Sequence, residues 1–360
     1  MQQVWPGRAE QHGFEYYRHG PFTAHAALST LTGNVLGHTI ARTPARLVGT
    51  VDESGWRPRE YSMSSLGPVG NVVRWIIVQA QKTTLRGSGG YSTESFAAKG
   101  DDRPFPQAYF ERDHFDDFFR LFPNFPLREA IRDKDVLDFG SGYGGKTVEY
   151  QTRCGARRVC GVEPFEGMVE QSRKYAETRG VAGVEFKVCA QNEIPYPDGS
   201  FDIVLSHDVL EHVEDPRISV AEIRRVLRPG GLSANVFPVY FGAMSHHLDY
   251  VANVPGLHWV FSPRILVRAV NDVLETNPQF GTSMQPEPRR SFDGSREVLP
   301  GLNGLSGIHL DNLFASFERL SMRRIAIGPR GMGLIARSRL PVQLRDLVTG
   351  TVACILRKPD

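Results

Sequence analysis

One stretch of the chain constrains its fold more than any other. The apolar segment Val136–Phe139 leads directly into a turn that contains Gly140, Gly142 and Gly144. Without side chains at these alternate positions, the backbone can bend sharply and come close to a ligand. The helix expected to follow offers its first N–H groups to the same ligand. A strand, a glycine turn and a helix in this order predict a nucleotide-type site at the carboxyl end of the first strand of an α/β sheet.

Short apolar strands alternate with amphipathic helical stretches between Pro104 and Tyr240. A helical lead-in is expected over Tyr109–Phe122. Such alternation implies right-handed crossovers and a parallel sheet with helices on both faces. The predicted strands are Val136–Phe139, Arg158–Val162, Val184–Val188, Phe201–Ser206 and Leu232–Phe237.

The chain beyond Tyr240 begins with an insertion rich in Pro, Gly and His. Two apolar segments, Ser321–Gly328 and Met332–Ser338, follow on either side of Pro329-Arg-Gly and predict an antiparallel hairpin at the sheet edge. A last helix and strand are expected within Val342 to Arg357.

Three parts are therefore expected along the chain. Residues 1–103 form an amino-terminal extension, which ends near a linker-like run, Arg86-Gly-Ser-Gly-Gly-Tyr-Ser-Thr. Residues 104–240 form the cofactor-binding core. Residues 241–360 provide a lid or substrate insertion and the carboxyl-terminal part of the sheet.

Composition narrows the classes of partner. Lys and Arg number 42 against 40 for Asp and Glu, and a formal charge of +2 provides no broad field for nucleic acid or an anionic membrane. No apolar run approaches the roughly 18 residues that span a bilayer, and the first ten residues lack the pattern of a signal peptide. The four cysteines show neither CxxC spacing nor a nearby histidine pair. We expect a cytoplasmic protein with buried, reduced thiols, no metal site and a small-molecule partner.

The glycine turn alone leaves the cofactor open, because Gly140, Gly142 and Gly145 also satisfy the GxGxxG pattern of dinucleotide binders. Asp138 favours a methyl donor, since its carboxylate can face the cationic amino-acid end of S-adenosylmethionine but would repel a pyrophosphate. Glu163 ends the second strand, where a carboxylate can accept from both ribose hydroxyls of either cofactor.

These motifs resemble those of the class I S-adenosylmethionine-dependent methyltransferases, over about Pro104 to Asp360. The stretch from Ile194 to Val213 resembles the fourth-strand region of that family, and Leu227-Arg-Pro-Gly-Gly the turn before its fifth strand. The resemblance implies a Rossmann-like α/β fold with a mostly parallel seven-stranded sheet, a reversed last strand and helices on both faces.

The resemblance also implies roles for individual residues. Asp138, Gly140, Gly142 and Gly144 would contact the methionine part of the cofactor, and Glu163 the ribose. The adenine would lie near Ala190 and Gln191, and His207, with Asp208, would line the methyl pocket. Many relatives have Asp where Ala190 stands, so the adenine contact would come from Gln191, Asn192 or the backbone.

Histidines are the candidates for taking a proton from an acceptor hydroxyl, because imidazole titrates near neutral pH. Four lie in suitable segments: His207, His212, His246 and His247. The adjacent pair His246 and His247 is the first choice, since two neighbouring imidazoles in a flexible insertion that borders the cofactor can reach an acceptor hydroxyl. The segment from Gly242 to Tyr250 resembles the lid of methyltransferases from surface-polysaccharide and glycoside biosynthesis. O-methylation of a small molecule or sugar is therefore the expected reaction.

The amino terminus resembles a different family. Residues 10 to 50 are similar to a β-hairpin of insertion-sequence transposases, with strands on either side of Thr32-Gly-Asn, and are expected to be a remnant without transposase chemistry. Three alternatives to an active methyltransferase stay open: a nicotinamide-dependent oxidoreductase, a catalytically silent cofactor-binding relative and a nucleic-acid-handling protein. The sequence does not indicate an oligomeric state.

Overall fold

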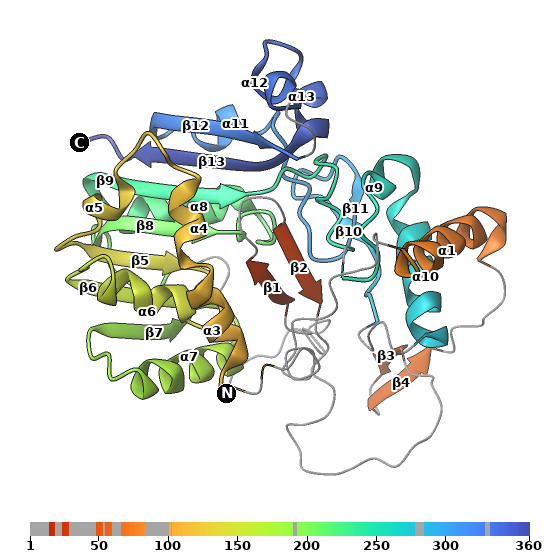
Figure 1. Cartoon of the computed structure of the whole chain (residues 1–360), viewed down its shortest axis with the longest axis horizontal. Coiled ribbons are helices and arrows are strands. Elements are labelled where there is room, and N and C mark those ends of the chain that lie inside the picture. Colours follow the sequence, from red (N-terminus) through yellow and green to blue (C-terminus); the bar gives the residue numbers. More distant parts are fainter. Residues whose placement is uncertain are drawn as a thin grey trace.

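The computed structural model of the chain is an α/β structure built on one large sheet (Figure 1). It describes residues 66–83, 101, 103–189, 193–248, 250–277, 284–327 and 332–360, together with four short strands nearer the start of the chain. The sheet has the strand order β12-β13-β9-β8-β5-β6-β7. In chain order its strands are β5 (Asp135–Phe139), β6 (Arg158–Glu163), β7 (Val184–Val188), β8 (Phe201–His207), β9 (Leu227–Phe237), β12 (Glu318–Ala326) and β13 (Thr349–Arg357).

β13 is the reversed strand of this sheet. It pairs antiparallel with both β9 and β12, whereas β5 to β9 are mutually parallel. The predicted Rossmann-like fold, with a mostly parallel seven-stranded sheet and a reversed last strand, is confirmed. The five predicted core strands are also confirmed, although β9 begins at Leu227 and its pairing with β8 shifts register before Leu232.

The chain changes direction within the sheet between β7 and β8. It runs outward from β5 through β6 to β7, then returns to place β8 on the other side of β5. Loops that leave β5 and β8 therefore diverge at the carboxyl ends of two adjacent parallel strands. Such a switch point is where open α/β sheets bind their ligands.

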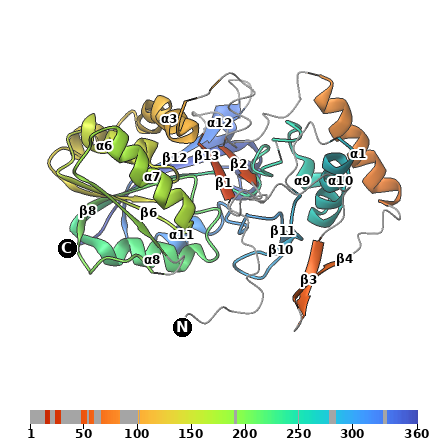
Figure 2. The same cartoon turned by 90° about the horizontal axis from the view of Figure 1, so that it is seen from below.

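Both faces of the sheet are covered by helices, because successive side chains of each strand point to opposite faces. Val136 of β5 packs with Phe118 and Tyr150 on one face, while its neighbour Leu137 packs with Val220 and Phe314 on the other. Figure 2 shows the two helical layers. The first contains α3 (Pro106–Asp113), α4 (Phe115–Arg120), α5 (Leu127–Ala130), α6 (Gly145–Thr152) and α7 (Glu166–Thr178), and the second contains α8 (Pro216–Val226) and α11 (Leu310–Leu313).

A second hydrophobic core lies beside the sheet domain. Helix α1 (Gly67–Gln81) packs along α10 (Pro263–Thr276) through Val73 and Ile77, and Arg74 forms an ion pair with Asp272 (Figure 1). Helix α1 was not among the predicted elements, and residues 1–103 were expected to be separate from the insertion. The structure instead joins α1 to the insertion in one core. The remaining short elements of the insertion are α9 (Leu257–Val260), β10 (Arg289–Arg290) and β11 (Glu297–Val298).

The predicted hairpin of Ser321–Gly328 with Met332–Ser338 is wrong. Its first half is β12, but the second half forms the helix α12 (Met332–Arg337), and β12 pairs with β13 instead. The segment Met-Gly-Leu-Ile-Ala-Arg contains several strong helix formers, and β13 offers a longer apolar partner strand. The last predicted helix and strand are confirmed as α13 (Val342–Val348) and β13.

Two short hairpins precede α1. β1 (Phe14–Arg18) pairs antiparallel with β2 (Ala24–Leu28), and β3 (Val48–Asp52) with β4 (Gly55–Arg59). Residues 19–23 separate β1 from β2, so the first hairpin does not turn at Thr32-Gly-Asn. That tripeptide and the linker-like run from Arg86 lie outside the described residues.

The four cysteines are buried free thiols, as expected, and burial raises the pKa of Cys154 to about 11. Within the described residues, we find no helix with both the length and the apolar composition needed to cross a membrane.

An ion-pair network holds the amino end of the sheet together and predicts a pH dependence of stability. Asp135 accepts from Arg157 at 2.9 Å and from Arg228 at 2.8 Å, and these contacts, Arg157 first, lower its pKa to about 2. Because the folded pKa lies below the unfolded value, the stabilisation is complete above about pH 4 and is lost as the pH falls towards 2. After discounting for the exposed arginines, we expect Asp135→Asn to cost about 1 kcal/mol at pH 7.

Urea unfolding of both proteins at pH 7 and pH 2.5 measures this effect. The stability difference between wild type and Asp135→Asn should shrink at the lower pH. An equal stability difference at both pH values would contradict the stabilising role of the ion pairs of Asp135.

Candidate functional site

Three positions of the turn after β5 have no room for a side chain. Gly140, Gly142 and Gly144 have φ angles of +78°, +57° and +80°. A Cβ on Gly140 would lie 2.4 Å from Cγ2 of Val209, and one on Gly142 would lie 2.5 Å from Oε1 of Glu111. Positive φ and lack of space both require glycine here. The turn is a narrow cradle of backbone at the switch point of the sheet.

Asp138 lies at the tip of β5, directly before this cradle. It is 1% exposed, and its Oδ2 accepts a hydrogen bond of 2.6 Å from Oγ1 of Thr147 on α6. A buried carboxylate at the tip of this strand suits a ligand that brings positive charge. The position agrees with the one the sequence predicts for the acid.

Glu163 ends β6, the strand beside β5. The residue is fully buried, and its Oε2 accepts from the backbone N–H of Gly142 at 3.1 Å. The parallel pairing of β5 and β6 brings both carboxyl ends to one edge, which places this carboxylate against the glycine turn. The structure therefore brings Asp138, Glu163 and the three glycines together as predicted.

Glu111 on α3 is a member of the site that no sequence pattern indicated. Its two carboxylate oxygens accept from the backbone N–H groups of Tyr143 at 3.0 Å and Gly145 at 2.8 Å. The sequence had assigned the first N–H groups of α6 to the ligand, and the structure corrects this, because Glu111 already uses the one on Gly145. No local motif connects Glu111 to Gly145, 34 residues later in the chain.

Lys146 and His207 meet on the other side of the cradle. The fully buried Nζ of Lys146 lies 2.8 Å from Nδ1 of His207, at the end of β8. An ammonium can only donate, so Nδ1 accepts and the ring proton is on Nε2, 3.5 Å from Oδ2 of Asp208. His207 thus lies beside the first turn of α6, its role in the methyl pocket stays a prediction, and the contribution of Lys146 was not foreseen.

The predicted pair His246 and His247 separates in the structure. Nδ1 of His246 accepts from the backbone N–H of Leu248 at 3.0 Å, and its Nε2 donates to the carbonyl of Val254 at 2.9 Å. Burial lowers the pKa of His246 to about 4. With both nitrogens bonded to backbone, His246 stabilises its own loop, and its predicted role as a base is corrected accordingly.

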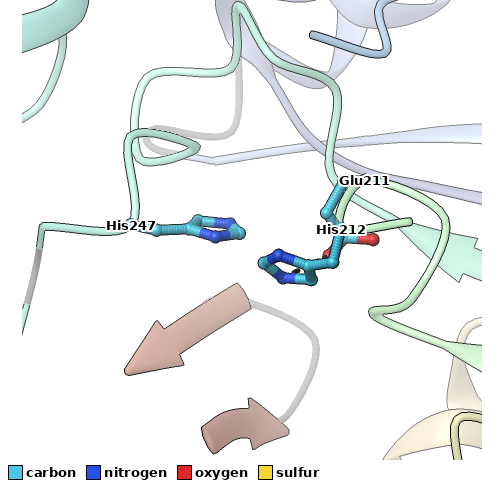
Figure 3. Close-up of side chains that lie close together, drawn as sticks. All are labelled: Glu211, His212 and His247. Carbon is cyan, nitrogen blue, oxygen red and sulfur yellow. Dashed lines mark ion pairs between the residues drawn. The ribbon is translucent and has the colours of Figure 1, made fainter. Parts of the chain in front are cut away.

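His247 points away from that loop, toward Glu211 and His212 (Figure 3). Glu211 and His212 follow β8, whereas His247 follows β9, and the parallel pairing of these strands brings the two segments to one edge. All three residues are buried, and His247 adopts a φ of +54°, which is unusual for a residue with a side chain.

The orientation of the His212 ring follows from its surroundings. Its Nδ1 lies 2.7 Å from the carbonyl oxygen of Gly301, to which it donates. Burial, with a smaller contribution from the Arg289 guanidinium, lowers the pKa of His212 to about 4. The ring is therefore neutral near pH 7, with its proton on Nδ1 and the lone pair of Nε2 facing Glu211 at 3.6 Å.

The predicted contacts to the adenine stay a prediction. Ala190 and Gln191 lie outside the described residues, as does Asn192. Cys189 and Glu193 on either side are described, and the thiol of Cys189 donates to the carbonyl of Glu193 at 3.2 Å.

Comparison with known proteins identifies the kind of domain that carries this site. Residues 137–234 match the family model of the methyltransferase domain. An uncharacterised methyltransferase of Schizosaccharomyces pombe is 34% identical over 127 residues, which cover 31% of this chain and 46% of that protein. The ubiquinone biosynthesis O-methyltransferase of Maricaulis maris is 34% identical over 128 residues, which cover 34% of this chain and 46% of that protein. A SAM-dependent methyltransferase from Methanosarcina mazei is 18% identical, with a TM-score of 0.41 over 65% of this chain and 98% of that structure.

Residues 137–234 are thus a methyltransferase domain, while the chain spans about half the length of the curated relatives it matches. The cofactor of such a domain is S-adenosyl-L-methionine. The site fits this group, because a turn with glycine at three positions lies next to the two buried carboxylates of Asp138 and Glu163.

Proposed function

We propose that the protein transfers a methyl group from S-adenosylmethionine to a hydroxyl oxygen of a small molecule or sugar. The observation that carries this proposal is the buried carboxylate of Asp138 at the mouth of the glycine cradle. The matched methyltransferase domain supports the methyl donor, and the sequence resemblance of the lid segment supports a glycan-like acceptor.

Each residue of the cradle has a defined task in this proposal. Asp138 binds the ammonium of the amino-acid end, and Glu163 accepts from the ribose hydroxyls while its Oε2 holds Gly142 in place. Glu111 fixes the shape of the turn from behind. When bound, the cofactor supplies a methyl carbon on a sulfonium, so the acceptor oxygen forms an O–C bond as the C–S bond breaks, and the acceptor proton is released. Alignment matters most in such a displacement.

A nicotinamide-dependent oxidoreductase is the second candidate, because the sheet and three of the glycines would serve it equally. Calorimetric titration of the folded protein with S-adenosylmethionine, S-adenosylhomocysteine and NAD⁺ separates the two. We expect binding of the first two only. Binding of NAD⁺ alone would replace the proposal with the oxidoreductase, and release of S-adenosylhomocysteine with a panel of candidate sugars would exclude a silent relative.

His247 is the residue that we propose to act on the acceptor substrate. It lies with Glu211 and His212 on the edge of the sheet that carries the cradle, and we propose that it assists removal of the hydroxyl proton. His247→Ala is expected to lower turnover by about 100-fold or more, because loss of help with a proton transfer has effects of that size. S-adenosylmethionine affinity should stay at the wild-type value.

His246→Ala is the matched control for this variant. Since both ring nitrogens of His246 bond to backbone, its removal should cost about 1–3 kcal/mol of stability, with little change in turnover per folded molecule. Thermal unfolding and single-turnover rates on both variants measure the two effects. Equal turnover in His247→Ala and wild type would remove His247 from the mechanism.

A further inference from the structure

We propose that Glu211, His212 and His247 form a site for a divalent first-row transition-metal ion such as Zn²⁺, on the acceptor side of the cofactor cradle. This differs from the expectation of no metal site, which rested on cysteine spacing. It deepens the function proposed above, on which its catalytic meaning depends, but the binding of the ion itself is independent of that function.

The spacing of the three side chains fits coordination better than hydrogen bonding. One ligand atom from each residue lies within 4.8 Å of the others. Nε2 of His212 and Oε1 of Glu211 are 3.6 Å apart, beyond hydrogen-bond distance. Two ligands bound to one Zn²⁺ at about 2.1 Å and a tetrahedral angle are about 3.4 Å apart.

The protonation of His212 favours the same conclusion. Because Nδ1 donates to the carbonyl of Gly301, the lone pair of Nε2 is directed toward a carboxylate oxygen of Glu211. The lone pair of Nε2 and a carboxylate oxygen of Glu211 thus face each other in a buried place, where both can ligate one cation. A histidine that ligates through one nitrogen and donates with the other to a backbone carbonyl is the usual arrangement at metal sites.

The surroundings are suited to retaining an ion. The side chains of Glu211 and His212 are each 4% exposed, and the two segments that bring the ligands together are anchored by neighbouring strands. The guanidinium of Arg289 donates to the carbonyl oxygen of His212 at 3.4 Å, and the carboxylate of Glu211 supplies negative charge 3.6 Å from Nε2 of the ring. His247 is oriented by its left-handed backbone.

The chemistry of this ligand set suggests what the ion would do. Two imidazoles and one carboxylate suit Zn²⁺, Co²⁺ or Fe²⁺ and leave coordination positions open. Two of the ligands, Glu211 and His212, lie two and three residues past Val209, whose side chain lies against Gly140 of the glycine cradle. We infer that an acceptor hydroxyl occupies an open position. There the ion lowers the pKa of the hydroxyl, its proton passes to water, and His247 acts as a ligand, not as the base itself.

Cobalt titration tests the site directly. Full-length protein without an affinity tag is freed of metal with a chelator, and Co²⁺ is added while the visible absorption of the bound ion is recorded. We expect a one-to-one complex that Zn²⁺ displaces. Glu211→Gln, which keeps the side-chain volume, and His247→Ala should each weaken binding by about 100-fold or more, since even loss of a supporting residue costs 10 to 100-fold.

His309→Ala is the matched control, because His309 also faces a carboxylate, Asp293, at 3.3 Å but lies outside the cluster. Its Co²⁺ affinity should equal that of wild type. Circular dichroism verifies that the variants fold. If His247→Ala does not fold, the Co²⁺ affinity of Glu211→Gln alone tests the metal site.

The outcomes separate the metal site from the methyltransferase function. Absence of Co²⁺ binding by folded wild type, or equal binding by Glu211→Gln, overturns the metal site, whatever the activity. If Co²⁺ binds as expected but S-adenosylmethionine does not bind in the same preparation, the metal site stands and the proposed function fails.

Discussion

Asp138→Asn is expected to weaken S-adenosylmethionine binding by about 100-fold, or ~3 kcal/mol, because a buried charge-assisted contact to the ligand ammonium is lost. The fold should be little affected, since the asparagine oxygen can still accept from Oγ1 of Thr147. Calorimetry on the purified variant, with unfolding measured in parallel, tests both parts.

Adenosine provides a control ligand for this variant, because it lacks the amino-acid end. Its affinity should be the same in wild type and Asp138→Asn, whereas Glu163→Gln should weaken adenosine as well. If Asp138→Asn weakened adenosine and S-adenosylmethionine equally, Asp138 would not act through the ammonium, and the main argument for the methyl donor would be lost.

Gly145→Ala is expected to destabilise the protein by about 3 kcal/mol, the upper part of the range for overpacking. Its Cβ would lie 2.0 Å from the carbonyl oxygen of Ala108 and 2.7 Å from Cβ of Glu111. Because the clash is with the backbone of α3, this helix must move away, and the capping of the glycine turn by Glu111 is lost. S-adenosylmethionine affinity should fall along with stability.

Gly167→Ala is the matched substitution in α7, where an added Cβ would meet nothing within 4 Å. It should be neutral or stabilise by up to about 1 kcal/mol, as alanine favours a helix over glycine. Urea unfolding of both variants gives the comparison. A Gly145→Ala protein as stable as Gly167→Ala would show that α3 and α6 are not in tight contact.

The sequence predicted those parts of the fold and site whose signals are local. Val136–Phe139 and the other core strands are short apolar runs with turn residues on both sides, so periodicity found them. Asp138 and Glu163 follow from their places at strand ends. Residues 332–337 show the limit of this approach, because a short apolar run fits a strand or a helix and only tertiary pairing decides between them.

The missed features depend on contacts between distant segments. Glu111 has no local pattern that links it to the glycine turn, and α1 becomes a core element only through α10. His246 and His247 are indistinguishable as neighbours in the sequence. Their roles differ because one ring bonds to backbone and the other lies beside a segment that leaves a different strand.

The packing of α1 on α10 limits how many residues can be removed from the amino terminus. A version beginning at residue 104 would retain every strand of the sheet and the whole matched domain, yet it would strip the cover from the apolar side of α10. The apolar side chains of α10 that pack against Val73 would then be exposed to solvent, and copies of such a fragment would associate through them. A stable form of this enzyme therefore has to include α1, which begins at Gly67, well before residues 137–234 that match the methyltransferase domain.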